Sequence, residues 1–158
     1  MTVSLVEIED LPKLLAPEAR LLGLDLGTKT IGMALSDVSR SVATPYETLR
    51  RTKFTADVKA IAAAIAENGV GALIIGLPIN LDSSEGPRAQ STRAFARNLA
   101  SLIAVPIVLW DERLSTQAVE RHLIEAGASR KRRAEVIDRM AAAYILQGAL
   151  DRLKRLGA

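Results

Sequence analysis

The 158-residue chain has no cysteine and only one histidine, His122. It can form neither a disulfide nor a thiolate metal site, and one histidine cannot make a zinc site. Any metal ion would therefore be bound through oxygen atoms. Aromatic residues make up only 3% of the chain, so recognition of nucleic-acid bases by stacking is not expected.

Long apolar runs are also missing from the sequence. No stretch approaches the ~20 apolar residues that span a bilayer, and the N-terminus lacks the basic start and apolar segment of a secretory signal. We therefore expect a cytoplasmic protein with no membrane partner, in agreement with the absence of cysteine. The chain is long enough, and apolar enough at 49%, to bury one sizeable core. We expect an acidic extension over residues 1–20 and a single domain over residues 21–158.

The charge is unevenly distributed along the chain. Basic residues outnumber acidic ones by 21 to 18, although residues 1–20 carry four acids and two bases. Fifteen of the basic residues are arginines, whose planar guanidinium groups suit phosphate oxygens. An arginine-rich composition can also reflect nucleotide bias, so the charge permits a nucleic-acid partner without requiring one.

The apolar periodicity predicts strands and helices in a fixed order. Three strands, at residues 21–26, 30–37 and about 42–50, are joined by connections short enough for antiparallel pairing. Next come a helix from Thr55 as N-cap to Asn68, a strand at 71–78, a helix from Pro87 and a strand at 105–110. The chain then continues with a helix from Ser115 or Thr116 to 124, a basic turn, and a last helix at about 134–156.

Helices that link successive strands imply parallel, right-handed crossovers. The order therefore predicts an α/β fold with a mixed five-stranded sheet, in which three antiparallel strands are followed by two parallel ones. Helices would cover both faces of this sheet. This is the architecture of the ribonuclease H-like class.

Three acidic residues stand out by their surroundings. Asp25 interrupts the first apolar strand, where an unpaired carboxylate would cost several kcal/mol. Glu112 comes just after the strand at 105–110, at the end where open α/β sheets bind ligands. Asp138 lies on the last helix, at the edge of its predicted inner stripe. We expect that stripe to consist of Ile137, Ala141, Tyr144, Ile145 and Gly148.

If the three carboxylates converge, a hard divalent cation, Mg²⁺ or Mn²⁺, would neutralise them. Such a site can activate water and stabilise the leaving oxygen of a phosphodiester, as a nuclease requires. Each acid also has an ordinary interpretation. Asp25 could accept hydrogen bonds in a turn, Glu112 could pair with Arg113, and Asp138 could pair with Arg133 or Arg139.

Basic residues near these acids are candidates for contacts with the nucleic-acid backbone, although a basic run is usually a solvated turn. The candidates are Lys29, Arg88, Arg113, Arg130, Lys131, Arg132 and Arg133. The polar loop at 80–88 precedes a helix N-terminus and could present amides to phosphate, or be an ordinary connection. Trp110 is expected in the core or in the wall of a cleft, and His122 on the surface of a helix.

Four segments resemble, in order and spacing, the signature segments of the YqgF family: LLGLDLGTKTIGMALSD, GLPINLDSSEGPRA, WDERLST and KRRAEVIDRMAAAYILQGALD. The family is similar to Holliday junction resolvases. The resemblance implies a ribonuclease H-like fold and a cytoplasmic bacterial nuclease that processes the 5′ end of pre-16S ribosomal RNA in ribosome biogenesis. By position, it implies that Asp25, Glu112 and Asp138 are the catalytic, metal-binding acids.

The chain departs from this pattern at two places. Junction resolvases also carry an acid after the strand that here spans 71–78, and this chain has none, so Glu112 would supply that carboxylate from a different strand. The family usually reads DGSEG where this chain reads LDSSEG. Ser83 would therefore be strained if the backbone there needs an angle suited to glycine.

Several alternatives for the function stay open. The segment DLGTKT also resembles the phosphate-binding loop of sugar kinases, actin and the Hsp70 ATPases, but those proteins close two lobes around a nucleotide and this chain supplies one. The protein could instead resolve Holliday junctions in branched DNA. It could also be a catalytically silent nucleic-acid-binding module in ribosome assembly or transcription. We expect an rRNA precursor or branched DNA as partner, and a monomer or homodimer.

Overall fold

The computed structural model describes residues 5–114, 126–127 and 129–157, without the side chains of residues 132–139. The strands are β1 (Arg20–Leu26), β2 (Thr30–Ser36), β3 (Ala43–Arg50), β4 (Val70–Leu77) and β5 (Ile107–Asp111). The helices are η1 (Ile8–Asp10), α1 (Leu11–Leu14), α2 (Phe54–Asn68), α3 (Pro87–Ala100) and α5 (Arg130–Arg155). The helix predicted between residues 115 and 124, with His122, lies outside the described residues.

The strands form one sheet in the order β3-β2-β1-β4-β5. β1 pairs antiparallel with β2, and β2 with β3, because the connections between them are short. β1 pairs parallel with β4, and β4 with β5, as the intervening helices require. The predicted mixed five-stranded sheet is confirmed. Within the described residues, no helix is both long and apolar enough to cross a membrane.

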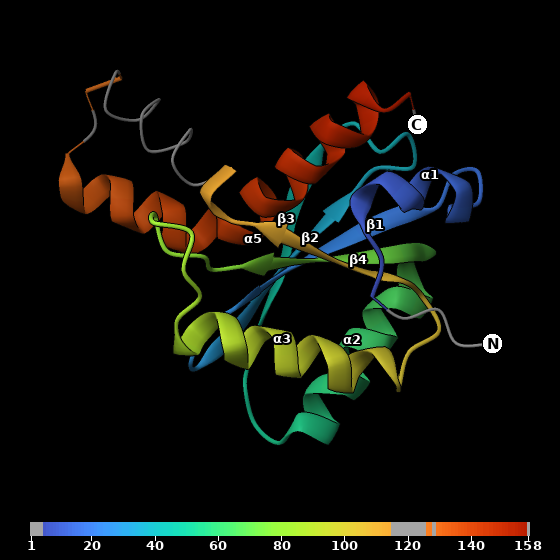
Figure 1. Cartoon of the computed structure of the whole chain (residues 1–158), viewed down its shortest axis with the longest axis horizontal. Coiled ribbons are helices and arrows are strands. Elements are labelled where there is room, and N and C mark those ends of the chain that lie inside the picture. Colours follow the sequence, from blue (N-terminus) through green and yellow to red (C-terminus); the bar gives the residue numbers. More distant parts are fainter. Residues whose placement is uncertain (1–4, 115–125, 128, 158) are drawn as a thin grey trace.

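The sheet is covered on both faces, as Figure 1 shows: α2 and α3 lie on one side and α5 on the other. The side chains of β1 alternate between the two layers, because successive residues of a strand point to opposite faces. Leu22, Leu24 and Leu26 join the apolar cluster beneath α2 and α3. Leu21 joins the cluster beneath α5, so Asp25, four residues further along the strand, lies on the face of α5.

The N-terminal segment packs on the same face as α5. Leu11 is fully buried, Ile8 is nearly so, and the backbone N–H of Val6 donates to the carbonyl of Ile107 at 2.9 Å. In the described part of residues 1–20, apolar side chains therefore complete the layer beside α5. Trp110 is buried in the same cluster, as expected.

Two predicted helix starts differ from the structure. The N-cap of α2 is Lys53, not Thr55. The N–H of Thr52, just before the helix, donates a hydrogen bond to the carboxylate of Asp57 in the first turn at 3.2 Å. α5 begins at Arg130, so most of the basic run predicted as a turn is helical, since neither glycine nor proline interrupts it. The end of α2 was predicted correctly, because Gly69 adopts a left-handed conformation with φ of 62°.

The buried stripe of α5 is also rotated from the predicted one. Of the predicted residues, Ile145 is buried, whereas Ala141, Tyr144 and Gly148 are only partly buried. The stripe consists of Ala142, Ala143, Ile145, Leu146, Ala149, Leu150 and Leu153. The helix lies so close to the sheet that a Cβ atom added at Gly23 would meet the Leu146 Cβ at 2.8 Å. Because α5 approaches the sheet so closely, the alanine-rich side of this helix is the side that packs on the sheet.

Candidate active site

Asp25 is placed by β1 near the carboxyl end of that strand, on the face covered by α5. Its register partner in the neighbouring strand is Gly32 of β2. A Cβ atom added at Gly32 would lie 3.8 Å from the Asp25 Cβ and 3.8 Å from the Ala142 Cβ of α5. The carboxylate therefore emerges between a glycine and a small residue of the covering helix.

Glu112 reaches the same place from the other side of β4. It follows β5, and its N–H donates to the Leu77 carbonyl at 3.2 Å, which extends the parallel pairing by one residue. β4 separates β5 from β1, and its residue at the crossing point is Gly76. A Cβ atom there would lie 2.8 Å from the Glu112 Oε1 and 2.9 Å from its Cγ. Because Gly76 has no side chain, the Glu112 carboxyl can extend over β4 and form a hydrogen bond with Asp25.

The electrostatics of this pair are unfavourable for two ionised carboxylates. Burial, followed by the negative charge of Asp25, raises the pKa of Glu112 to about 7, and Arg88 only partly opposes the shift. At neutral pH the pair therefore retains a proton for part of the time. The donors are hard oxygen atoms on adjoining carboxyl groups, which is the chemistry that a divalent cation such as Mg²⁺ or Mn²⁺ requires, and such a cation would relieve the repulsion.

Asp138, the third predicted acid, belongs to α5, four residues before Ala142 and seven before Ile145. Its side chain lies outside the described residues, so its place in the site stays a prediction. Among the described side chains, no group of three metal-ligating residues occurs.

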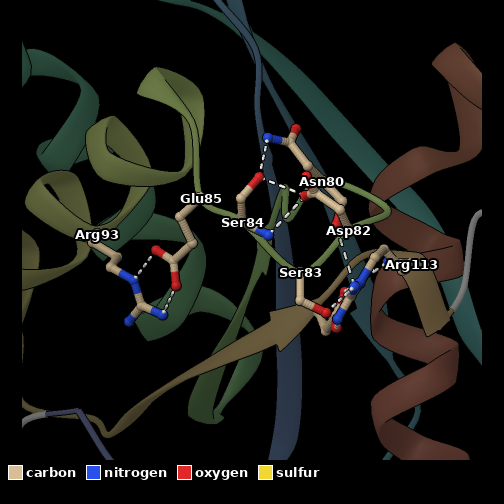
Figure 2. Close-up of polar contacts among 8 residues, drawn as sticks. Asn80, Asp82, Ser83, Ser84, Glu85, Arg93 and Arg113 are labelled. Carbon is tan, nitrogen blue, oxygen red and sulfur yellow. Dashed lines mark hydrogen bonds and ion pairs between the residues drawn. The ribbon is translucent and has the colours of Figure 1, made fainter.

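Arg113 does not pair with Glu112, as the ordinary interpretation of this acid would require. Its Nη2 donates to the Asp111 Oδ2 at 2.7 Å, and its Nη1 donates to the Asn80 carbonyl and to the Ser83 Oγ, both at 3.2 Å. These contacts tie the loop after β4 to the end of β5 (Figure 2). Arg113 is thereby held against Asp111 and the loop, and Glu112 is left to face Asp25; the predicted contact of Arg113 with nucleic acid stays a prediction.

The loop after β4 closes on itself. Ser84 donates through its N–H to the Asp82 Oδ1 at 2.9 Å, and the amides of Asn80 and Ser83 are bonded to carbonyls within the loop. These amides are therefore not free to receive a phosphate. Ser83 has φ of 74°, which confirms that a residue other than glycine occupies a left-handed position here. At the far end of the loop, Glu85 pairs with Arg93 of α3 (Figure 2).

Among the basic candidates, Arg88 acts on the carboxylate pair: its charge lowers the pKa of Glu112, and its Nη2 donates to the Leu26 carbonyl at 3.4 Å. Lys29 is exposed in the β1–β2 turn. Arg130 and Lys131 are exposed at the start of α5, and the side chains of Arg132 and Arg133 lie outside the described residues.

Two cavities lie at this end of the sheet, and Arg88 lines both of them; Glu112 lines only the first. The loop cavity, of about 390 Å³, is lined by Pro78, Ile79, Asn80, Leu81, Gly86, Pro87, Arg88, Ala89, Glu112 and Arg113. The turn cavity, of about 470 Å³, is lined by Leu26, Gly27, Thr28, Arg51, Thr52, Arg88, Ser91, Thr92 and Phe95. The sequence analysis did not single out Arg51, and its only signal was a place in the basic run that ends β3.

Comparison with known proteins identifies a family and its relatives. The family model described as RuvX, Holliday junction resolvase, matches residues 19–152. Two curated relatives are named "Putative pre-16S rRNA nuclease". The chain is 57% identical to the protein of Methylocella silvestris over 158 residues, which cover 100% of this chain and 98% of the relative. It is 64% identical to that of Paramagnetospirillum magneticum over 137 residues, which cover 87% and 88%.

Solved structures share the fold at low sequence identity. The chain is similar to T. thermophilus RuvC in complex with a Holliday junction substrate, with a TM-score of 0.57 and 13% identity over 89% of this chain and 97% of that one. It is also similar to the yeast mitochondrial Holliday junction resolvase, with a TM-score of 0.50 and 12% identity over 95% of this chain and 84% of that one. The ribonuclease H-like architecture predicted from the order of elements agrees with these neighbours.

Proposed function

Since the chain belongs to the RuvX family, we propose that it is a nuclease that hydrolyses phosphodiester bonds in structured nucleic acid, with the 5′ end of pre-16S rRNA as its substrate in ribosome biogenesis. The observation that carries the proposal is the contact between the Asp25 and Glu112 carboxyls beneath α5. The names of the two relatives at 57% and 64% identity support the choice of substrate.

In this proposal, Asp25 and Glu112 hold a divalent cation, Mg²⁺ or Mn²⁺, and Asp138 adds a third carboxylate from α5. Such an ion would supply an activated water and would stabilise the leaving oxygen of the phosphodiester. The protein holds its two described carboxylates in place through the backbone of β1 and the extended pairing of β5. Arg88 stands beside Glu112, where it opposes the negative charge of the substrate phosphate.

Cleavage of branched DNA is a second candidate, favoured by the description of the matching family model. Resolution of a four-way junction requires symmetric incisions and therefore two active sites in a homodimer, whereas a monomer suffices for RNA processing. We place the activity in the cytoplasm, where ribosomal RNA matures in bacteria.

The proposal is tested by incubating the purified protein with a 5′-extended 16S rRNA fragment and, separately, with a four-way DNA junction. Each reaction contains Mg²⁺, Mn²⁺ or EDTA. We expect cleavage of the RNA with either metal, none with EDTA, and a loss of about 10³-fold or more in rate for Asp25→Asn and for Glu112→Gln. Glu47→Gln, on the exposed surface of β3, is the matched control and should cleave normally.

Three results would overturn parts of this reading. Cleavage of the junction alone would favour the resolvase. Binding of both substrates without cleavage would favour a silent binding module. Unchanged cleavage by Asp138→Asn would remove that residue from the site.

A further inference from the structure

The turn cavity is a separate compartment on the α3 side of the sheet, since Leu26 and Phe95 belong to the apolar cluster of that side, and it shares Arg88 with the loop cavity that Glu112 lines. It lies where the β1–β2 turn, the residues after β3 and the first half of α3 come together. Figure 1 shows the β1–β2 turn close to the beginning of α3. The cavity therefore joins three segments that are distant in sequence, which is a feature of built binding sites rather than of a single surface loop.

Two guanidinium groups line this cavity, and none of its lining residues is acidic. The Nη1 of Arg51 donates to the Gly27 carbonyl at 2.6 Å, and its guanidinium carbon lies 5.5 Å from the centre of the Phe95 ring. Among the described residues, neither Arg51 nor Arg88 forms an ion pair with a carboxylate. The positive charge of Arg51 is thus positioned by a carbonyl and a ring, whereas the charge of Arg88 also acts on Glu112.

The remaining polar groups of the lining are small hydroxyls. They belong to Thr28, Thr52, Ser91 and Thr92. Arginine guanidinium groups and hydroxyl groups donate hydrogen bonds to phosphate oxygens, and the positive charges of the arginines repel a metal cation. The Phe95 ring is already covered by Arg51, so it is not available to stack on a base. The chemistry therefore fits a phosphate group.

The position of the cavity connects it to the cleavage site. Its wall begins at Leu26 and Gly27, the two residues that follow Asp25, and a strand advances about 3.3 Å per residue. Arg88 lines the turn cavity and also acts on Glu112. A substrate strand that runs from the two carboxylates past Arg88 and over the end of β1 would bring a neighbouring phosphate to this cavity on the α3 side of the sheet.

We propose that the turn cavity binds a backbone phosphate of the substrate strand next to the cleaved one, with Arg51 as its main contact. This inference rests on the proposed nuclease function, because that function places the strand. It adds a specific subsite: the register in which the strand enters is set by Arg51 after β3.

Binding is measured by fluorescence anisotropy on the 5′-extended rRNA fragment, in the Asp25→Asn background so that cleavage does not interfere. We expect Arg51→Ala to weaken binding about tenfold and to lower the salt dependence of log K by about one phosphate contact, or ~0.7 to 0.9 in slope. Arg50→Ala is the matched control, since Arg50 is the preceding residue, is exposed and does not line the cavity. It should change binding far less.

A chemically modified substrate identifies the phosphate. A neutral methylphosphonate placed at each position near the cleavage site in turn should weaken binding to the parent protein at one position. Arg51→Ala should be insensitive to that same substitution. If the modification reduces binding of both proteins equally at every position, the subsite is disproved.

A second variant guards against effects of Arg51 on folding. Ser91→Glu adds a negative charge to the cavity from an exposed helical position, and it should weaken RNA binding without lowering the melting temperature. Unchanged binding by this variant would contradict the proposal.

Calorimetry with ATP and with inorganic phosphate tests whether the cavity binds the phosphate of a free small molecule instead of a phosphate of the RNA backbone. Micromolar ATP binding that is lost in Arg51→Ala would assign the cavity to a free nucleotide instead.

The failure of this subsite differs from the failure of the nuclease. If the RNA is bound in the manner described but is never cleaved, the subsite stands and the proposed function fails. If the RNA is cleaved and Arg51→Ala binds and cleaves like the parent, the function stands and the subsite fails.

Discussion

The two faces of the sheet are built from the same strands but differ in what they contain. Towards α2 and α3, β1 and β4 present large apolar side chains such as Leu24 and Ile75, both fully buried. Towards α5, the same strands present Gly23, Asp25 and Gly76. One face maximises apolar burial, whereas the other provides space in which a helix can approach and two carboxyls can meet.

This difference shows how the protein separates stability from chemistry. Glycine within a strand weakens it, and adjoining carboxylates destabilise each other. Both unfavourable features are confined to the α5 face, where close packing of Leu146 on Gly23 and the burial of Ile145 partly offset them. The opposite face should therefore carry stability without controlling cleavage, whereas the α5 face, which also buries an apolar cluster, should control cleavage.

The largest expected effect on stability comes from the α2 and α3 face. Leu24→Ala removes a fully buried side chain and should lower the free energy of unfolding by about 2–5 kcal/mol. Cleavage per folded molecule should change little, because the carboxylate pair lies on the other face. Urea denaturation and a single-turnover cleavage assay at low temperature measure the two quantities. A large loss of cleavage in fully folded Leu24→Ala would break the comparison.

A smaller loss of stability, with a larger loss of activity, is expected on the α5 face. In Gly76→Ala the new Cβ would lie 2.5 Å from the Ile145 Cδ1 and 2.8 Å from the Glu112 Oε1, so both side chains must move. We expect a destabilisation of about 1–3 kcal/mol and a loss of about 100-fold in cleavage rate, since misplacement of a catalytic group by ~1 Å suffices for this.

Gly32→Ala is the control for this variant. The Cβ atom added at Gly32 would find its nearest neighbours at 3.8 Å, an ordinary contact distance, although Gly32 also lies on the α5 face and opposite Asp25. It should fold and cleave nearly normally. Equal effects of Gly32→Ala and Gly76→Ala would show that the space over β4 has no special role.

The smallest expected effect is a gain in stability. The folded state raises the pKa of Glu112 from 4.5 to about 7, so the folded protein binds this proton more tightly than the unfolded chain does. The stabilisation from this proton is complete below about pH 4.5 and is lost as the pH rises through about 7. Glu112→Gln should therefore melt a few degrees higher than the parent at pH 8 in EDTA.

The same substitution should make little difference at pH 4.5, and divalent metal should remove the advantage at pH 8, because the ion stabilises only the parent. Thermal melts at both values of pH, with and without metal, check these signs. A lower melting temperature for Glu112→Gln at pH 8 in EDTA would contradict the electrostatic strain assigned to the pair.

Much of the fold could be predicted because it depends on local pattern. The run around Asp25, the helix end at Gly69 and the helix start at Pro87 all carry signals within a few residues of themselves. The resemblance to a family that has glycine at Ser83 raised only the condition that a glycine-like angle would be strained there, and the structure shows that Ser83 adopts such an angle. The rotation of α5 was not predicted, since it depends on how closely the helix approaches glycines of the sheet.

The site was only partly predictable for the same reason. Asp25 and Glu112 could be selected from their places in and after apolar strands, and the structure brings them together. The importance of Gly76 could not be seen, because a glycine in a strand has many explanations until its neighbours are known. Arg51 was missed, since its proximity to Arg88 exists only after β3 and α3 have packed.

The sequence by itself determined the order of strands and helices, the mixed sheet, and which acids stand at strand ends, because these follow from periodicity, turn residues and connection length. Only the tertiary structure decided that Glu112 extends over Gly76 to Asp25, that Arg113 pairs with Asp111, and that Arg51 and Arg88 line one cavity. Distances between side chains on different strands are set by packing, and no short stretch of sequence encodes them.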